Sequence, residues 1–301
     1  MLNSYLFQVP DNKKVNVIID TDAKNEADDQ YAIVHALLSP KLRVLGITAA
    51  HFSKRRTNFS MMESYEECQK ITKLMKMTDV PVLKGNPEEL TSEENAEVSE
   101  AARFIAAKVM ETKEKIYILC MGALTNVAAA LLFEPEIGEK LHVIWVGGKK
   151  PNAENDGREA NTRNDYKAVN VVMKRCKNIV HIPAECYSKF QLSLAELQVK
   201  VRPYGEIGNY LFEELIDFNY RVNRPWSLGE SWSLGDNSAV SHVLNPGNSV
   251  IEKRKAFLLN ESLDIVENLD REIEMVAEID SRYALEDLFA KLQLAYQCQY
   301  K

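Results

Sequence analysis

The feature that most constrains the fold is a series of short apolar segments, rich in β-branched residues, that alternates with stretches of helical periodicity. The apolar segments span residues 15–19, 42–48, 116–120, 142–146 and 179–182. The helical stretches between and after them span residues 29–38, 60–77, 97–111, 126–133 and 165–174. Continuous apolar runs of this length are typical of strands buried on both faces of a parallel sheet. The alternation therefore predicts a doubly wound or barrel-like α/β fold with right-handed crossovers.

The last third of the chain has a different pattern. Helical periodicity at 192–200 and 207–221 is followed by a Trp/Gly/Asn-rich segment at 223–237, two short strands near 255–259 and 272–279, and a helix at 284–296. No internal repeat or linker divides the sequence. We therefore expect a single domain over residues 1–301, with a mostly parallel, Rossmann-like central sheet flanked by helices.

Charge and cysteine content exclude several classes of protein. The net charge is −7, from 37 Lys and Arg against 44 Asp and Glu, which argues against binding a nucleic acid polymer. No apolar run reaches the roughly 18 residues of a membrane span, and the N-terminus lacks the features of a signal peptide. The cysteines are odd in number and form no CxxC pair, which predicts free thiols in the cytoplasm, without a zinc site or a disulfide. They are Cys68, Cys120, Cys176, Cys186 and Cys298.

Polar segments follow the predicted strands at residues 20–29, 48–53, 120–126, 147–161 and 185–187. In an open parallel sheet, ligands bind beyond the carboxyl ends of the strands. The sequence therefore places a small-molecule site at this edge of the sheet.

The first of these segments carries five carboxylates in ten residues: Asp20, Asp22, Glu26, Asp28 and Asp29. Acids crowded between a buried strand and a helix start repel one another unless a cation lies among them, and a hard divalent ion prefers oxygen ligands. Helix capping is the alternative, but it explains only Asp28 or Asp29. An EF-hand is excluded because the segment lacks the central Gly and the terminal Glu of that loop.

These residues and four later segments resemble the inosine- and uridine-preferring nucleoside hydrolases, whose opening motif is D-x-D-P-G-x-D-D. Residues 46–52 resemble the family's segment after the second strand, and Met-Gly-Ala-Leu-Thr-Asn at 121–126 resembles its T-G-x-L-T-N turn. Val-Gly-Gly at 146–148 with Glu-Ala-Asn at 159–161 resembles its M-G-G and E-x-N segments, and Leu-Gly-Asp at 234–236 contains its late aspartate. The resemblance runs from about residue 15 to residue 240.

The resemblance implies hydrolysis of the N-glycosidic bond of ribonucleosides to free base and ribose, by direct attack of a calcium-bound water. Ca²⁺ would be bound by Asp22, Asp29, Asp236 and the carbonyl of Met121, and Asp22 would also be the general base. Asp28 would hold a ribose hydroxyl. The remaining ribose contacts would come from Glu159 and Asn161, with Asn152 or Asn155 as further candidates. Asp20 would orient its neighbours. A role in purine and pyrimidine salvage, and a homodimer or homotetramer, are also compatible with this family.

The chain departs from the family pattern at two places. The segment Ala-Lys-Asn-Glu-Ala between Asp22 and Asp28 is two residues longer than the family's, so Glu26 is a further candidate contact. Gly235 stands where many members have a histidine that serves the leaving base. His51 is a spare candidate for that acid, although a lone histidine is more often structural.

An aromatic segment supplies the other candidate for the leaving base. W-S-L-G occurs twice, at Trp226 and at Trp232, and indole faces stack well on nucleobases. Both indoles could instead pack the segment onto the body of the protein. We expect at least Trp232 to reach the base, because it lies four residues from Asp236, while Tyr187 and Tyr220 are weaker candidates.

Two alternative functions remain open. Haloacid-dehalogenase-like phosphatases also begin with a strand followed by D-x-D, but the late segment at 235–240, Gly-Asp-Asn-Ser-Ala-Val, lacks their second acid. A non-catalytic nucleoside or sugar binder on the same fold would fit the altered loop and Gly235. The intact Asp22, Asp28 and Asp29 argue against it.

Overall fold

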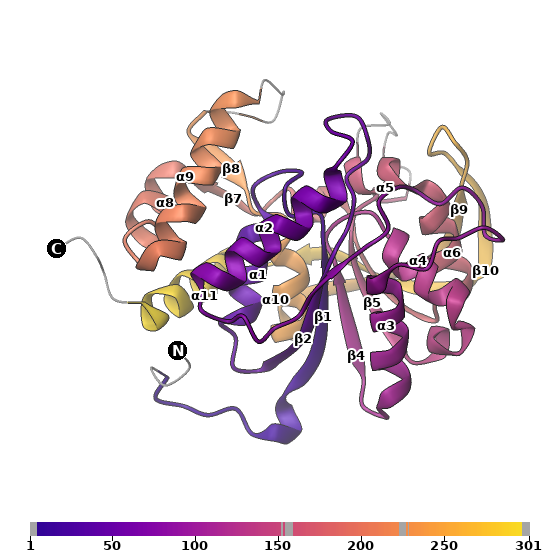
Figure 1. The fold of residues 1–301 in the computed structure, drawn as a ribbon, viewed down its shortest axis with the longest axis horizontal. Coiled ribbons are helices and arrows are strands. Elements are labelled where there is room, and N and C mark those ends of the chain that lie inside the picture. Colours follow the sequence, from indigo (N-terminus) through magenta and orange to yellow (C-terminus); the bar gives the residue numbers. More distant parts are fainter. Residues whose placement is uncertain (1–4, 152, 154–158, 223–226, 228, 297–301) are drawn as a thin grey trace.

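The computed structural model describes residues 5–151, 153, 159–222, 227 and 229–296. At its centre is an eight-stranded sheet with the order β3-β2-β1-β4-β5-β6-β10-β9 (Figure 1). Neighbouring strands run parallel except for β9, which pairs antiparallel with β10 at the edge. The predicted fold class, a mostly parallel sheet flanked by helices, is confirmed. The strands are β1 Val15–Thr21, β2 Leu42–Ala49, β3 Val82–Lys84, β4 Ile116–Cys120, β5 Leu141–Val146, β6 Asn178–Ile182, β9 Ser249–Leu259 and β10 Ile265–Ile279.

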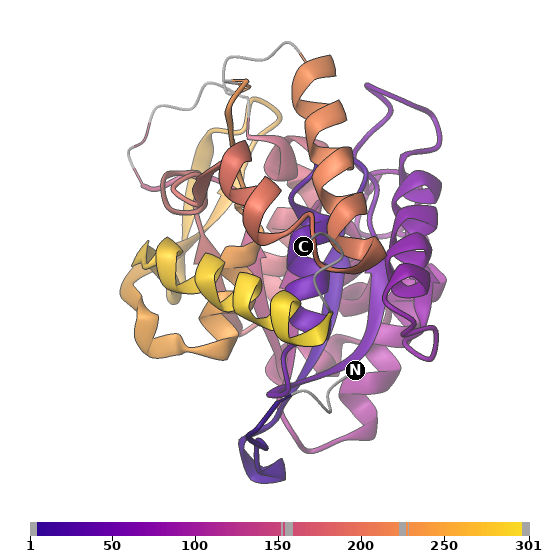
Figure 2. The same cartoon turned by 90° about the vertical axis from the view of Figure 1, so that its left-hand side faces the viewer.

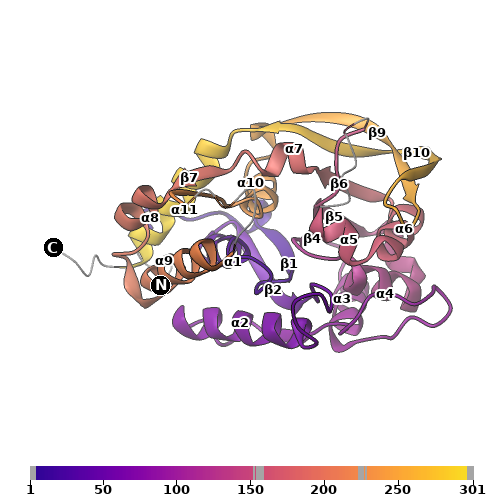
Figure 3. The same cartoon turned by 90° about the horizontal axis from the view of Figure 1, so that it is seen from above.

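Helices cover both faces of the sheet. Successive residues of a strand point to opposite faces, so each buried strand contributes apolar side chains to both layers. In β1, Val17 and Ile19 pack into one apolar cluster and Ile18 packs into the other. The two layers of helices can be followed in Figure 3, which looks onto the end of the sheet. The first cluster includes α1 Asp29–Leu37, α2 Ser60–Leu74, α10 Asn237–Leu244 and α11 Ser281–Ala295. The second includes α3 Glu100–Glu111, α4 Thr125–Phe133 and α6 Tyr166–Arg175.

The strand order reverses between β1 and β4, and this reversal positions the site. From β1 the chain steps outward to β2 and β3, whereas from β4 it steps in the opposite direction to β5 and β6. Crossovers on opposite sides leave a crevice outside the carboxyl ends of the two adjacent strands. β1 ends at Thr21 and β4 ends at Cys120, so the acidic segment and the turn at 121–126 meet there.

A smaller unit lies beside the crevice. It consists of α8 Leu194–Lys200, α9 Gly205–Arg221 and a two-stranded antiparallel sheet of β7 Gln191–Ser193 and β8 Ser231–Ser233. Figure 2 shows α8 and α9, in orange, on the same side of the molecule as α11, in yellow. The sequence predicts a helix from residue 192 and a loop through 223–237; the structure instead has short strands at Leu192 and Trp232, which pair with each other.

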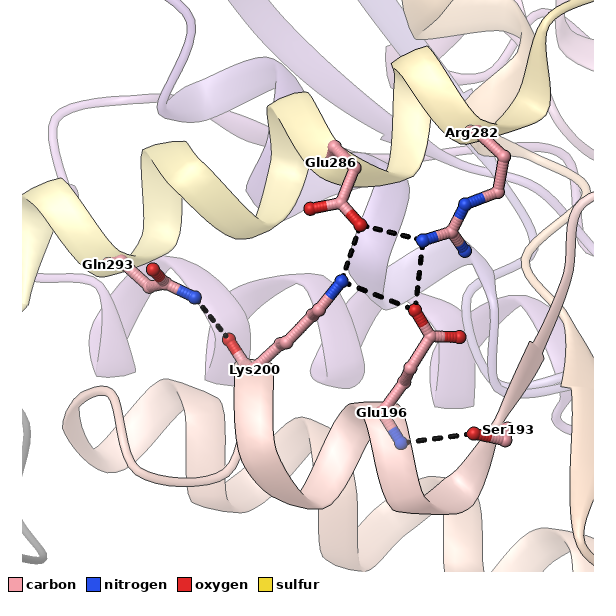
Figure 4. A network of polar contacts seen from close by, with 6 residues as sticks. All are labelled: Ser193, Glu196, Lys200, Arg282, Glu286 and Gln293. Atoms are coloured by element: carbon pink, nitrogen blue, oxygen red, sulfur yellow. Dashed lines mark hydrogen bonds and ion pairs between the residues drawn. The ribbon is translucent and has the colours of Figure 1, made fainter.

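Ion pairs hold this unit against the C-terminal helix (Figure 4). Glu196 and Lys200 of α8 face Arg282 and Glu286 of α11, with Arg282–Glu196 at 3.0 Å and Arg282–Glu286 at 2.6 Å. Lys200 forms ion pairs with the same two carboxylates, with Glu196 at 3.3 Å and with Glu286. Each pair is partly exposed and contributes little alone, typically about 0–1 kcal/mol. Together they fix α8, and α8 continues directly from β7.

Among the described residues, no helix is both long enough and apolar enough to span a membrane.

Candidate functional site

A cavity of about 440 Å³ opens at the carboxyl ends of β1, β4 and β5. One wall is acidic and comes from the segment after β1 and from the start of α10. A second wall is mostly neutral and comes from α7 Ala184–Tyr187, β7 and β8. The predicted site residues that line this cavity are Asp22, Asp28, Asp29, Met121, Glu159, Asn161, Trp232 and Asp236.

Three carboxylates form the centre of the acidic wall. One oxygen each from Asp28, Asp29 and Asp236 lie within 4.8 Å of one another. Burial raises the pKa of Asp28 to about 6. Burial, followed by the charge of Asp28, raises the pKa of Asp29 and of Asp236 well above the ordinary value. Such a cluster is unfavourable by itself and favours a cation among its oxygens.

Two helix starts hold these acids. Asp29 is the first residue of α1 and Asp28 precedes it, while Asp236 directly precedes α10. The partial positive charge at helix N-termini favours carboxylates at both places. Within the described chain, the side chains of Asp28 and Asp236 make no capping hydrogen bond. Helix capping therefore does not account for either acid.

Asp22 lies beside this cluster and is almost fully buried, at 2% exposed. It is not one of the three acids grouped above: the predicted calcium ligands include Asp22 and not Asp28, whereas the three clustered oxygens belong to Asp28, Asp29 and Asp236. A Cβ added at Gly122 would lie 3.0 Å from the Cβ and Cγ of Asp22, so a side chain there would press on Asp22 and the glycine allows the turn after β4 to pack closely against it. Burial, followed by the charges of Asp29, Asp28 and Glu26, raises the pKa of Asp22.

Asn25, which the motif did not identify, fixes Asp22. Its backbone N–H donates to the Asp22 carbonyl at 2.7 Å, and its Nδ2 donates to Asp22 Oδ2 at 3.1 Å. Asn25 also lines the cavity. Asn25 belongs to the longer segment between Asp22 and Asp28. The extra length of that segment was the only sign in the sequence that its residues make contacts of their own at the site.

The longer loop is anchored from outside the cavity. The Arg56 guanidinium donates to the carbonyl of Asn25 and lies 4.0 Å from the Glu26 carboxylate. Lys24 forms an ion pair with Glu67 at 3.4 Å and a second with Glu214 of α9. The insertion is therefore tied to α2 and α9 and presents Asn25 and Glu26 to the cavity.

Asn161 stands on the short helix α5 Ala160–Asn164. Its Nδ2 donates to the carbonyls of Val146, at 2.8 Å, and Met121, at 3.2 Å. The predicted ligand carbonyl of Met121 thus already accepts one hydrogen bond, and one lone pair remains. Because its nitrogen is committed to the backbone, the Oδ1 of Asn161 is the side-chain atom that can accept further hydrogen bonds.

Glu159 caps α5, and this structural role was not predicted. Its Oε2 accepts from Gly148 N at 2.7 Å and from the N and Oγ1 of Thr162, at 2.8 and 2.5 Å. Its Oε1 accepts from Asn161 N at 3.1 Å and from the Tyr187 hydroxyl at 3.3 Å. The carboxylate therefore fixes the turn after β5 and the orientation of Asn161, in addition to lining the cavity.

His51 requires a correction. Its side chain is fully buried and lies outside the described lining of the cavity. Nδ1 accepts from Ser53 N at 3.2 Å, so the neutral ring carries its proton on Nε2, 2.8 Å from Thr125 Oγ1. Thr125 in turn donates to Asp165 at 2.8 Å. Burial lowers the pKa of His51 to about 4, and the side chain joins β2 to α4 instead of facing a leaving group.

The neutral wall contains Trp232 and several residues that the motif did not indicate. Trp232 is 3% exposed and contacts the edge of Phe218, with ring centroids 5.6 Å apart. Tyr187, Ser188, Gln191 and Ser233 line the cavity with it. Tyr187 was one of the two weaker candidates from the sequence, whereas Ser188, Gln191 and Ser233 gave no signal because β7 and β8 become neighbours only in the folded chain. Tyr220 is 67% exposed, and Asn152, Asn155 and Trp226 lie outside the described residues.

Asp20 is fully buried and lies outside the described lining of the cavity. Its Oδ1 accepts from Thr48 Oγ1 at 2.6 Å and from Asn126 Nδ2 at 2.8 Å. Burial raises its pKa to about 6. The side chain thus ties the end of β1 to β2 and α4.

Comparison with known proteins gives a consistent result. The family model described as inosine-uridine preferring nucleoside hydrolase matches residues 17–285. Uridine nucleosidase 1 of Arabidopsis thaliana is 27% identical over 72% of this chain and 68% of that protein. The pyrimidine-specific ribonucleoside hydrolase RihA of Salmonella agona is 25% identical over 76% of this chain and 79% of that protein. A solved structure, the purine-preferring ribonucleoside hydrolase from Gardnerella vaginalis, aligns with a TM-score of 0.75 at 20% identity, covering 93% of this chain and 99% of that one.

Proposed function

The chain belongs to the inosine-uridine preferring nucleoside hydrolase family, whose members are N-glycosyl hydrolases, and from this premise we propose a calcium-dependent ribonucleoside hydrolase that releases free base and ribose. The observation that carries the proposal is the gathering of Asp28, Asp29 and Asp236 next to Asp22 in one cavity. The neutral wall of the same cavity includes Trp232, which would offer an aromatic surface for a base.

The donor set fits a hard cation. The clustered atoms are carboxylate oxygens, and no histidine or cysteine belongs to the described lining of the cavity. Ca²⁺ takes six to eight oxygen ligands at about 2.3–2.6 Å, and carbonyl oxygens such as that of Met121 are suitable additions. When bound, the ion would supply the positive charge that orients a water molecule and lowers its pKa.

The protein's own residues would perform the remaining chemistry. Asp22, held by Asn25, would remove the proton from the attacking water as general base. Cleavage of a glycosidic bond passes through an oxocarbenium-like state, which the surrounding carboxylates would stabilise. Asn161 Oδ1 and Asp28 would accept hydrogen bonds from ribose hydroxyls, with Glu159 fixing Asn161.

Stacking would assist the departing base. Gly235 offers no side chain, and His51 lies outside the cavity. Trp232 is therefore our candidate for contact with the base, and the proton that the base needs would come from water. This arrangement also makes a non-catalytic nucleoside binder the second candidate, because no histidine in the described lining can act as an acid.

The names of the relatives guide the choice of substrates. The two curated relatives are named for uridine and for pyrimidine nucleosides, and the solved structure is named for purines. Uridine and inosine therefore both belong in the assay. We place the activity in purine and pyrimidine salvage in the cytoplasm, in keeping with the free, buried thiols of Cys68, Cys120, Cys176 and Cys186.

The deciding experiment incubates the purified protein with uridine, inosine or p-nitrophenyl phosphate, with Ca²⁺ or with a chelator. We expect reducing sugar from a nucleoside, loss of that activity on chelation and its recovery on addition of Ca²⁺. Asp22→Asn serves as the inactive control. Binding of nucleosides without hydrolysis would establish the binder instead, and release of p-nitrophenol would establish a phosphatase.

A further inference from the structure

Gly235 and Tyr187 form a matched pair in the wall of the cavity. A Cβ added at Gly235 would lie 2.8 Å from Tyr187 Cδ2 and 3.5 Å from Asp28 Oδ2. The first distance is well below carbon–carbon contact, so the present ring position and a side chain at 235 exclude each other. Tyr187 therefore occupies space that a larger residue at 235 would need.

The ring of Tyr187 is fixed at both ends. At the backbone, the Tyr187 carbonyl accepts from Ser233 Oγ at 3.3 Å and from Phe190 N at 3.2 Å. At the tip, the hydroxyl donates to Glu159, whose carboxylate is itself held by backbone N–H groups. The carbonyl contacts fix the main chain of Tyr187, and swinging the ring aside for a ligand would break the hydrogen bond from its hydroxyl to Glu159.

The division of the cavity shows which part of a nucleoside this ring faces. The sugar develops positive charge during cleavage and belongs at the acidic wall, near Asp22 and Asp29. A flat, neutral base belongs at the wall formed by Tyr187, Gln191 and Trp232. Because Tyr187 also contacts Gly235, next to Asp236, it lies where the two walls meet.

From this geometry we infer that Tyr187 is a specificity-determining residue, which narrows the base side of the cavity and selects nucleosides with a single-ring base. The inference rests on the proposed hydrolase function. It assigns to one residue the preference for uridine over inosine. The ring of Tyr187 would limit the size of the base that the cavity accepts, and the absence of a side chain at Gly235 leaves room for the ring in this position.

The test measures kcat/KM for uridine and inosine with the calcium-loaded enzyme. We expect the wild type to favour uridine and Tyr187→Ala to raise the inosine-to-uridine ratio at least tenfold, since steric differences of one methylene already change such ratios by about tenfold or more. Tyr187→Phe is the matched control: it keeps the ring, and its ratio should stay within threefold of the wild-type value. A wild type that favours inosine, or a Tyr187→Ala ratio within threefold of wild type, overturns the inference.

A second variant keeps the test decisive if Tyr187→Ala does not fold. Gly235→Ala pushes against the ring and should lower the inosine-to-uridine ratio, whereas in a folded Tyr187→Ala background it should have no further effect. An unchanged ratio in Gly235→Ala alone contradicts the inference. A wild type that cleaves neither nucleoside removes the proposed function and this inference with it, whereas an active enzyme with unmoved ratios removes the inference alone.

Discussion

Neutralising Asp28 should stabilise the calcium-free protein and weaken its response to calcium. The Asp28 carboxylate lies within 4.8 Å of Asp29 and Asp236 oxygens, and burial raises its pKa to about 6. Asp28→Asn removes this charge but keeps an oxygen that can accept from Asp236 N, which is 3.4 Å from Asp28 Oδ2. The same substitution removes one negative charge from the cluster that is our candidate calcium site.

The magnitude follows from the pKa. The pKa of Asp28 is raised from the ordinary value of 3.8 to about 6 in the folded state, so the folded protein binds the proton more tightly than the unfolded chain. The free energy of unfolding is therefore highest below pH 3.8, where the carboxyl is protonated in both states, and it falls as the pH rises through 6. At pH 8 the ionised carboxylate therefore destabilises the folded state by up to about 3 kcal/mol. For 301 residues, this corresponds to a change in Tm of about 5 °C. At pH 4.5 the difference should shrink to about 1 kcal/mol.

Thermal unfolding with a chelator and with excess Ca²⁺ tests both effects. With the chelator at pH 8, Asp28→Asn should melt about 5 °C above the wild type. Calcium at 100 times its Kd should raise the wild-type stability by about 2.7 kcal/mol and that of the variant by much less. Asp270→Asn, at a fully exposed aspartate, is the control and should change neither value. A chelated variant that melts below the wild type, or equal calcium shifts in both proteins, would refute the reasoning.

Other substitutions test the remaining roles. Asp22→Asn should lower kcat on uridine by about 10²–10⁴ in steady-state assays. A folded variant with wild-type turnover would show that another residue is the general base. Asn161→Ala should cost about 1–3 kcal/mol of transition-state binding, read as a fall in kcat/KM; an unchanged value for every nucleoside would remove its ribose contact. Trp232→Ala should slow inosine cleavage more than cleavage of p-nitrophenyl riboside, whose leaving group needs no proton; equal slowing would contradict stacking on the base. His51→Ala should leave both rates nearly unchanged and lower unfolding stability by about 1–3 kcal/mol, because its hydrogen bonds to Thr125 and Ser53 are lost; selective loss of inosine cleavage would restore its role as an acid.

The sequence predicted most of the central sheet because its strands are apolar on both faces. β1 and β4 were recognisable because a strand that is buried on both faces of a sheet has a continuous run of apolar residues in the sequence. β3 was missed because it has only three residues, none of them buried, at the edge of the sheet. α10 was missed because its eight residues follow a loop-like Gly-Asp pair, and tertiary packing against α1 outweighs that local signal.

The residues alone predicted proximity only within one short segment, whereas Met121, Glu159, Asn161 and Asp236 were candidates because of the family resemblance. Asp22, Asp28 and Asp29 share one short segment, so their proximity followed from the strand end alone. Tyr187 and Gly235 come together through strands that pair across a gap of many residues, and no local pattern records such a contact. His51 was left open between a spare acid and a structural residue, because a polar residue after a strand can point toward a ligand or into the core; its contact with Thr125 and its place outside the described lining support the structural role.

The insertion after Asp22 shows how the acidic loop can lengthen without losing its geometry. A longer loop adds conformational freedom, which would loosen the position of Asp22 unless new contacts offset it. Here Lys24 binds Glu67 and Glu214, and Arg56 holds the carbonyl of Asn25, so both contacts lie outside the cavity. Inside it, the Asn25 side chain bonds to Asp22 Oδ2. The positive charges are thus placed behind the loop, where they counter the carboxylates without occupying the space between them, and that space remains for a cation.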